Sequence, residues 1–260
     1  FLEKQLGAEQ ANNLMGSQVR LWRYSHRWYK PLQKEEYTLR ISPKGEFLGF
    51  FHEVAEELEG AHLTADSARI ASQAFLSQIA RIDTASLEFV EHSQNERPKR
   101  MDHTFVWKRK GFDVQDATYR YRVQVQGAEI GAYSEFLHVP EKWSREYAKL
   151  RAKNDTTGMA AGLLLLLTII AMLVMFIVHI RHRDIRWKTA IVFGAVAVVL
   201  TLLSSLNTLP IDEYNFGTTD PYASLLTRTL IMDVLQALGT GLFIFFLTAA
   251  AEPLYRERYP

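Results

Sequence analysis

Two hydrophobic patterns divide this chain. Before residue 158, apolar residues are interleaved with many charged and aromatic ones, whereas residues 158–251 are mostly apolar. Three runs in the apolar part, residues 158–180, 189–209 and 229–251, are each long enough to cross a hydrocarbon core of about 30 Å as a helix. Because lipid offers the backbone no hydrogen-bond partners, we predict that all three are transmembrane helices.

The charges of the connecting loops predict how these helices are oriented. The loop "HIRHRDIRWK" is rich in arginine and carries a single acid, so the positive-inside rule places it in the cytoplasm. The loop "PIDEYNFGTTDPYASLLTR" carries three acids and only Arg228, and is expected outside. Cations before the first run oppose this orientation, but long domains are exported largely regardless of charge. The polar N-terminal part is therefore expected to be extracytoplasmic.

The two ends of the chain suggest that it belongs to something longer. It begins "FLEKQLGAEQ", without an initiator methionine or an apolar signal region. We expect an upstream membrane or signal segment that starts the export of the polar part. Residues 252–260 are expected to be the cytoplasmic start of a missing C-terminal region.

A period of two dominates two stretches of the polar part. The stretches "YTLRISPKGEFLGFFHEV", from Tyr37, and "YRVQVQGAEIGAYSEFL", from Tyr121, each alternate apolar and polar residues on both sides of a glycine. The glycines are Gly45 and Gly127. This pattern predicts paired antiparallel strands with one buried face. Further strands are predicted in "QVRLWRYSHRWY", "SLEFVEH" and "HTFVWKRK".

A helix is predicted ahead of each strand pair. The first begins at "FLEKQLG", and the second has Thr64 as its N-cap with Asp66 in its first turn. The apolar stripe of the second helix is predicted to consist of Ala68, Ala71, Phe75 and Ile79. We therefore expect an α+β domain over residues 1–139, built from two tandem units, about 1–55 and 64–139, that each pack a helix on an antiparallel sheet.

A short segment connects this domain to the membrane part. In residues 140–157, Pro140 suits a first helical turn, and Trp143, Tyr147 and Leu150 share one helical face. Asn154 to Thr157 could interrupt this helix or cap the next. We expect a semi-rigid helical stalk that enters the first membrane helix.

These features together resemble a known family. The strand pair in "VQVQGAEIGAYSEFLHVPEKW", after a helix–strand unit, looks like PepSY-like domains. Two such units, a stalk, and a membrane region whose third helix ends in "AAAEPLYRERYP" are similar to bacterial CPBP-type (CAAX-protease-like) intramembrane metalloproteases with an extracytoplasmic N-terminal extension. The resemblance implies a location in the bacterial cytoplasmic (inner) membrane. It also implies a parent intramembrane metallo-endopeptidase, with zinc as its metal, whose catalytic glutamates and histidines follow residue 260.

Two functions are compatible with this resemblance. PepSY-like domains are associated with inhibition or ligand sensing, so the chain is expected to be the regulatory or sensor and membrane-anchor portion of such a protease, with no catalytic residue, cofactor or metal of its own. The alternative is a non-enzymatic membrane sensor or assembly protein that binds a peptide or a cell-envelope ligand. The expected partners are the lipid bilayer, such a ligand and the missing C-terminal membrane domain.

One stretch spells the family's catalytic motif in the wrong place. In "EEYTLR", Glu35, Glu36 and Arg40 fit the pattern Glu-Glu-x-x-x-Arg. The neighbours alternate as a strand, which directs Glu35 and Glu36 to opposite faces, and the stretch is far from the first apolar run. We therefore interpret it as a solvated strand.

The histidines offer only weak metal sites. His52 is followed four residues later by Glu56, not by a second histidine. His179 and His182 are three residues apart at the inner membrane edge and could bind a metal together. The favoured interpretation is that both are polar side chains that lie among arginines at the lipid headgroups. No two of the remaining histidines have a spacing typical of metal ligands. They are His26, His62, His92, His103 and His138.

Polar residues inside the apolar runs are candidate functional groups. Asp233 and Gln236 interrupt the third run, and Asn207 lies near the outer end of the second. Placing a carboxylate inside the membrane costs free energy. We therefore predict that Asp233 forms an interhelical hydrogen bond, and the alternative is that it binds a substrate or transfers a proton. Gly239 and Gly241 are predicted to let two helices approach closely.

Composition narrows the partners further. The net charge of +1 gives no reason to expect nucleic acid, and the absence of cysteine excludes disulfides and thiolate chemistry. The aromatic and basic run "RLWRYSHRWYK" is interpreted as a strand with a buried aromatic face, and the alternative is a groove for a peptide or the cell wall.

Overall fold

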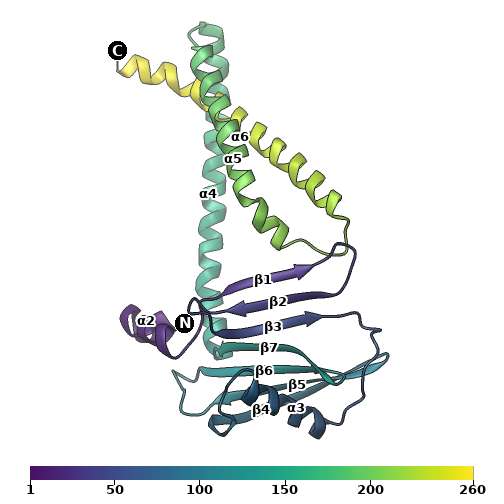
Figure 1. The fold of residues 1–260 in the computed structure, drawn as a ribbon. Coiled ribbons are helices and arrows are strands. Elements are labelled where there is room, and N and C mark those ends of the chain that lie inside the picture. The colour runs from purple at the N-terminus through teal and green to yellow at the C-terminus, as the bar shows by residue number, and fades with distance from the viewer. Residues whose placement is uncertain (260) are drawn as a thin grey trace. The chain divides into compact units, whose positions relative to one another are not determined.

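The computed structural model describes residues 1–259 (Figure 1). The chain divides after Glu146 into two compact units, and each is described by itself. The first holds all the strands, and the second consists of long helices. The α+β part and the apolar helical part expected from the sequence are therefore both present.

The strands of the first unit form one antiparallel sheet of seven, in the order β1-β2-β3-β7-β6-β5-β4 (Figure 1). Their bounds are Tyr24–Tyr29 for β1, Glu36–Ile41 for β2, Phe47–Glu53 for β3, Leu87–Arg97 for β4, Arg100–Arg109 for β5, Thr118–Gln126 for β6 and Glu129–His138 for β7. Every stretch predicted to be a strand contains one, although in "QVRLWRYSHRWY" only Tyr24–Tyr29 is a strand. The turns at Gly45 (φ 81°) and Gly127 (φ 62°) are confirmed, and both use the left-handed region that glycine adopts without strain.

The two strand sets share one sheet rather than forming two. Strand β3 pairs with β7 through Gly49 and Ser134, Phe50 and Tyr133, and Phe51 and Ala132. This short ladder is the junction between β1–β3 and β4–β7. The sequence predicted a separate sheet for each unit, because local alternation does not reveal which non-neighbouring strands pair. The assignment of each strand set to a PepSY-like unit stays a prediction.

Three helices accompany the sheet. They are α1 (Leu2–Leu6), α2 (Ala8–Ser17) and α3 (Ala65–Gln78). The predicted N-cap of α3 is confirmed, since the Thr64 hydroxyl accepts a hydrogen bond from the Ser67 backbone N–H at 3.3 Å. The predicted apolar stripe needs correction: Leu76 is fully buried, whereas Ile79 is 60% exposed because it lies at the C-cap, beyond the last helical residue.

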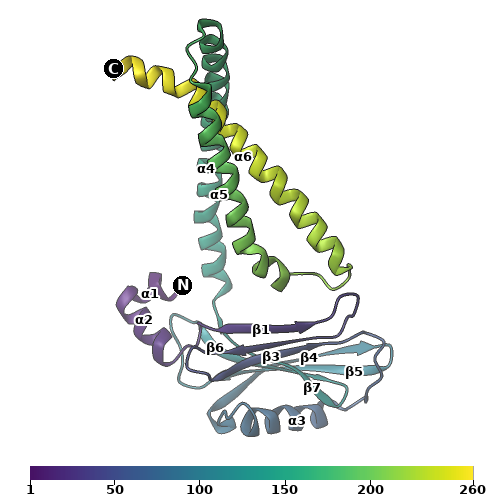
Figure 2. The same cartoon turned by 45° about the horizontal axis from the view of Figure 1, so that its top comes forward.

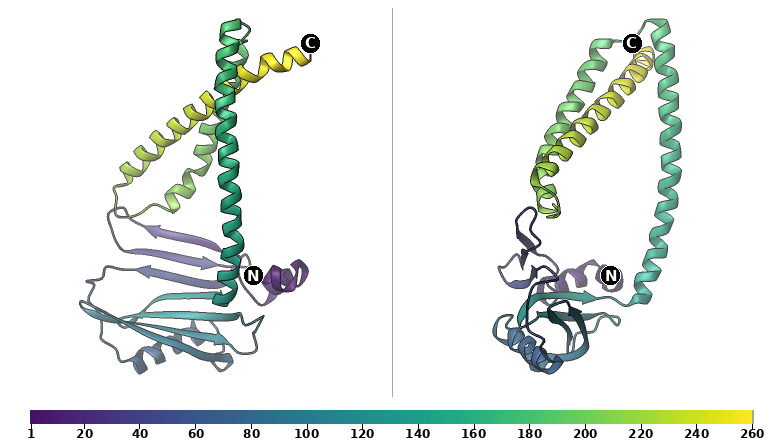
Figure 3. Two further views of the ribbon diagram at one scale, coloured as in Figure 1. Left: turned by 180° about the vertical axis from the view of Figure 1, so that it is seen from behind. Right: turned by 90° about the vertical axis from the view of Figure 1, so that its right-hand side faces the viewer.

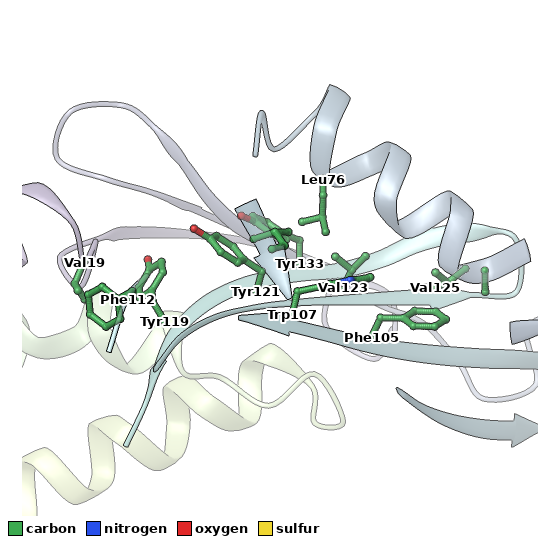
Figure 4. Packing of buried hydrophobic residues seen from close by; sticks show 12 residues of the cluster. Val19, Leu76, Phe105, Trp107, Phe112, Tyr119, Tyr121, Val123, Val125 and Tyr133 are labelled. Carbon is green, nitrogen blue, oxygen red and sulfur yellow. The ribbon is translucent and has the colours of Figure 1, made fainter. Parts of the chain in front are cut away.

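The main hydrophobic core lies between α3 and the strands that it crosses (Figures 2 and 4). Its buried members are Val19, Ala68, Leu76, Leu87, Phe105, Trp107, Phe112, Tyr119, Tyr121, Val123, Val125 and Tyr133. Most come from β5, β6 and β7, and along β6 and β7 the buried positions alternate with positions that are mostly partly buried. The α3-covered face of these strands is therefore closed to ligands.

The second unit contains three helices long and apolar enough to cross a membrane. They are α4 (Glu141–His182), which begins in the first unit, α5 (Trp187–Tyr214) and α6 (Tyr222–Arg258). Each of the three predicted membrane runs lies inside one of them. The stalk is helical, as expected, but residues 154–157 neither interrupt α4 nor cap a new helix. Pro140 precedes α4 rather than lying in its first turn, and α6 continues past residue 252 to Arg258.

Helices α5 and α6 pack closely, side by side (Figure 3). A Cβ atom added at Gly241 would lie 2.4 Å from Cγ2 of Val198 and 3.0 Å from the carbonyl oxygen of Gly194, so the two helices approach closely at this crossing. The predicted close packing is thus confirmed for Gly241 but not for Gly239, which faces open space. Helix α4 reaches the pair near its C-terminal end, where the Phe176 ring lies 4.9 Å from that of Phe246.

Candidate functional site

The best candidate site is an apolar groove on strands β1, β2 and β3. It has a volume of about 500 Å³. We call it the β1–β3 groove, and its lining residues are Trp28, Tyr37, Thr38, Leu39, Phe47, Phe50 and Phe51. A concave surface built almost entirely from aromatic and aliphatic side chains is typical of a binding site for an apolar ligand.

Strand register brings four of these side chains to one face, whereas Phe51, directly opposite Thr38, lies on the other face. Trp28 lies opposite Tyr37 in the β1–β2 ladder, and Leu39 lies opposite Phe50 in the β2–β3 ladder. Directly opposite residues share a face of an antiparallel sheet, so the four side chains adjoin one another. Trp28 is 55% exposed and Tyr37 is 45% exposed. The sequence favoured a buried aromatic face here, and the exposure of Trp28 corrects that reading.

The groove begins where the cover of α3 ends. Phe75 of α3 packs against Phe50, with ring centroids 6.0 Å apart, and against Tyr133 at 5.5 Å. Phe50 is thus shared between the core and the groove. The same face of the sheet continues past β3 to Tyr37 and Trp28, which are exposed. The groove is therefore an open extension of the hydrophobic core.

Polar contacts hold the Tyr37 ring at one end of the groove. The Tyr37 hydroxyl donates to the Glu35 carboxylate at 2.8 Å, and the same carboxylate lies 2.9 Å from Nε2 of His52. The rings of Tyr37 and His52 stack with centroids 4.2 Å apart. The hydrogen bond from His52, followed by that from Tyr37, lowers the pKa of Glu35, and the hydrogen bond to Glu35 raises the pKa of Tyr37.

The glutamate-pair stretch is a strand, as interpreted from its alternation. Glu36 forms a salt bridge with Arg27 of β1, and the Arg40 guanidinium lies over the Phe51 ring at 4.4 Å. Glu35 is exposed and precedes the strand. Across residues 1–259, no group of three or more histidine and acidic side chains is arranged to hold a metal ion. The contacts of Glu36 and Arg40 link β1, β2 and β3.

Two histidines that the sequence left apart meet in the first unit. Nε2 of His92 on β4 lies 3.0 Å from Nδ1 of His103 on β5, and Nε2 of His103 lies 2.9 Å from the Leu63 carbonyl oxygen. Burial, and then the nearby charge of His103, lower the pKa of His92. The pair anchors the segment before α3. Eleven residues separate the two rings in the chain, so only the β4–β5 register reveals their contact.

A buried carboxylate escaped the sequence analysis altogether. Glu135 on β7 accepts hydrogen bonds from the hydroxyls of Tyr119 (2.7 Å) and Tyr133 (2.6 Å) and forms a salt bridge with Arg20. Burial, and then the charge of Glu135, raise the pKa values of both tyrosines, so they remain donors. Glu135 lies two residues after Tyr133 in β7 and therefore on the same inward face. This spacing of two is the sequence signal that could have identified Glu135 as buried.

His179, at the predicted inner membrane edge, contacts an acid rather than His182. Nδ1 of His179 lies 3.1 Å from the Asp184 carboxylate, while His182 is exposed. Arg256 of α6 donates to the Asp184 carbonyl oxygen at 2.8 Å. The helix ends after His182, and the reversal at Arg183 (φ 55°) turns Asp184 back toward His179. These contacts join the α4–α5 loop to α6.

Asp233 faces a cavity rather than the polar residues named with it. It is half-buried and lines a space of about 690 Å³ together with Asp212, Asp220 and Arg228. Asn207 and Gln236 are exposed and do not line this space. Within residues 1–259, Asp233 makes no hydrogen bond with Asn207, so the expected interhelical bond is absent there.

Comparison with known proteins finds no match to this chain among protein-family models, curated proteins or solved structures.

Proposed function

We propose that this protein is a membrane-anchored sensor whose sheet domain binds a peptide or cell-envelope ligand in the β1–β3 groove. The observation that carries the proposal is the uncovered aromatic face, where Trp28 and Tyr37 remain half-exposed next to the core residue Phe50. Large exposed aromatic side chains gathered in one concavity are uncommon on proteins without a binding partner. Three apolar helices would hold this domain at the bilayer.

A regulatory role toward a CPBP-like intramembrane metalloprotease is the more specific form of this proposal. A peptide-binding domain attached to such a protease would select or withhold its substrates, and the zinc chemistry would belong to membrane helices encoded after residue 260. The order of sheet domain and apolar helices supports this form, because it is the order in the family that the sequence resembles. A glutamate pair and histidines on those later helices would distinguish it from a stand-alone sensor.

The proposal places the sheet domain outside the cytoplasm of a bacterial cell, since the arginine-rich α4–α5 loop should stay inside. A reporter enzyme that is active only after export should therefore be active when fused at Thr218 and inactive when fused at Asp184. Activity at Asp184 with none at Thr218 would reverse the orientation and place the groove in the cytoplasm.

Removing the groove's exposed aromatic rings should weaken ligand binding. We expect peptides selected from a random library on the full chain in lipid nanodiscs to bind the Trp28→Ala, Tyr37→Ala double variant at least about tenfold more weakly, because each ring contributes roughly 1 kcal/mol or more at a contact. Fluorescence polarisation of the labelled peptides measures the affinity.

The matched control is Trp22→Ala, which removes a 71% exposed indole outside the groove. It should leave the affinities unchanged. Selected peptides that bind the double variant as well as the unmodified chain would remove the groove from the function.

A further inference from the structure

Strand β1 is an open edge of the sheet. Within residues 1–259 it pairs with β2 alone and forms the end of the strand order. Alternate residues of an edge strand direct backbone N–H and C=O groups away from the sheet, where another chain can pair with them. This edge runs along the β1–β3 groove, because Trp28 belongs to both.

The opposite edge of the same sheet carries a bulge, and β1 does not. Strand β4 carries a bulge between Phe89 and Glu91, together with the acids Glu88 and Glu96. Bulges and charges of this kind are the usual means of preventing unwanted pairing. The β1–β2 register is unbroken from Tyr24 to Tyr29, and β1 contains neither proline nor an acid. The difference between the two edges indicates that β1 is kept available.

The charges on β1 and on the residues that flank it in the chain are of one sign. Residues 18–34 contain no acid. Arg27 and Lys34 have salt-bridge partners in Glu36 and Glu53. Arg23 and Lys30, just outside the two ends of β1, are exposed and form no salt bridge in the described part of the chain. At roughly 3.3 Å per residue they are about 23 Å apart along the strand, which is the separation of the two end residues of an eight-residue extended peptide.

Building on the proposed function, we infer that the ligand is an extended peptide that pairs with β1 as an additional strand. Its alternate apolar side chains lie over Trp28 and Tyr37, and acidic residues near its two ends face Arg23 and Lys30. Main-chain hydrogen bonds supply affinity in this mode, while side-chain pockets and the flanking charges supply specificity.

The test uses the full chain in nanodiscs of zwitterionic lipid and a synthetic probe, the peptide Glu-Val-Thr-Val-Thr-Val-Thr-Glu. Two further versions carry N-methyl groups, each on one of the two alternating sets of backbone amides. Only one set can face β1, so one version should bind about tenfold more weakly than the probe while the other keeps most of its affinity. Equal binding of both versions, or no binding of the probe, would overturn the inference.

Charge is tested by the Arg23→Glu, Lys30→Glu variant. It should prefer a probe with lysine at both ends, whereas the unmodified chain prefers glutamate; both side chains are exposed, so the fold should be kept, as circular dichroism would verify. An unchanged preference would overturn the inference. The inference would also be overturned if anionic nanodiscs shifted the tryptophan fluorescence of the peptide-free chain and prevented the probe from binding. The β1 edge would then be binding lipid. Both results leave unaffected the expected dependence of library-peptide affinity on Trp28 and Tyr37. That dependence tests the groove itself.

Discussion

Replacing Glu135 with alanine should lower the free energy of unfolding of the sheet domain by about 3–5 kcal/mol, the range for removing one partner of a buried ion pair. The Glu135 side chain is 1% exposed. Its loss leaves the buried hydroxyls of Tyr119 and Tyr133 without their acceptor. It also leaves the partly buried Arg20 without its main partner. Burial on its own lowers the pKa of Arg20, but the hydrogen bond and charge of Glu135 outweigh this effect and raise it, so the arginine stays charged.

The measurement is pulse proteolysis of the nanodisc-embedded chain over a series of urea concentrations. Glu46→Ala is the matched control, because Glu46 also approaches Arg20, at 3.9 Å, but has a side chain that is 49% exposed. An exposed pair of this kind contributes about 1 kcal/mol or less. Equal losses from the two variants would mean that the buried network does not stabilise the sheet.

Replacing Gly49 with alanine should separate the two strand sets. A Cβ atom at Gly49 would lie 2.6 Å from the backbone carbonyl oxygen of Tyr133, and a backbone oxygen in a paired strand cannot rotate away. Strand β3 would have to move off β7. We expect a loss of roughly 1–3 kcal/mol, as for other overpacked sites, and a larger loss for Gly49→Val.

Hydrogen exchange measured by mass spectrometry locates this effect. Amides of β1, β2 and β3 should exchange faster in Gly49→Ala, while those of β5 and β6 stay protected, since the junction between the sets is a single short ladder. Gly131→Ala is the control, because the nearest atoms there belong to the flexible Gln126 side chain. Uniformly faster exchange over the whole sheet would show that the two sets unfold together.

The exposed groove and the open edge depend on the same junction. Phe50, which lines the groove, is held by Phe75 of α3 and by its pairing with Tyr133 of β7. In the first unit, α3 meets the β1–β3 set at Phe47 and Phe50, so the neighbouring part of the fold supports the groove there. A ligand that stabilises β1–β3 would therefore strengthen this junction, and a loosened junction would weaken ligand binding.

Local sequence patterns determined the elements of this protein. Long apolar runs predicted the long helices, because length and hydrophobicity suffice for that inference. Period-two alternation and the glycines at 45 and 127 predicted strands and turns, and Thr64 marked the start of α3. Each of these signals acts between residues that are close in the chain. They also sufficed to interpret "EEYTLR" as a strand.

Tertiary structure alone decided how the elements combine. The pairing of β3 with β7, the contact of His92 with His103, and the meeting of Arg20 with Glu135 depend on strand register and on residues distant in the chain. Alternation reveals that a strand has two faces, but it cannot tell which face a distant helix covers. The sequence therefore predicted a buried aromatic face on β1, and the extent of α3 left Trp28 exposed beside an open edge.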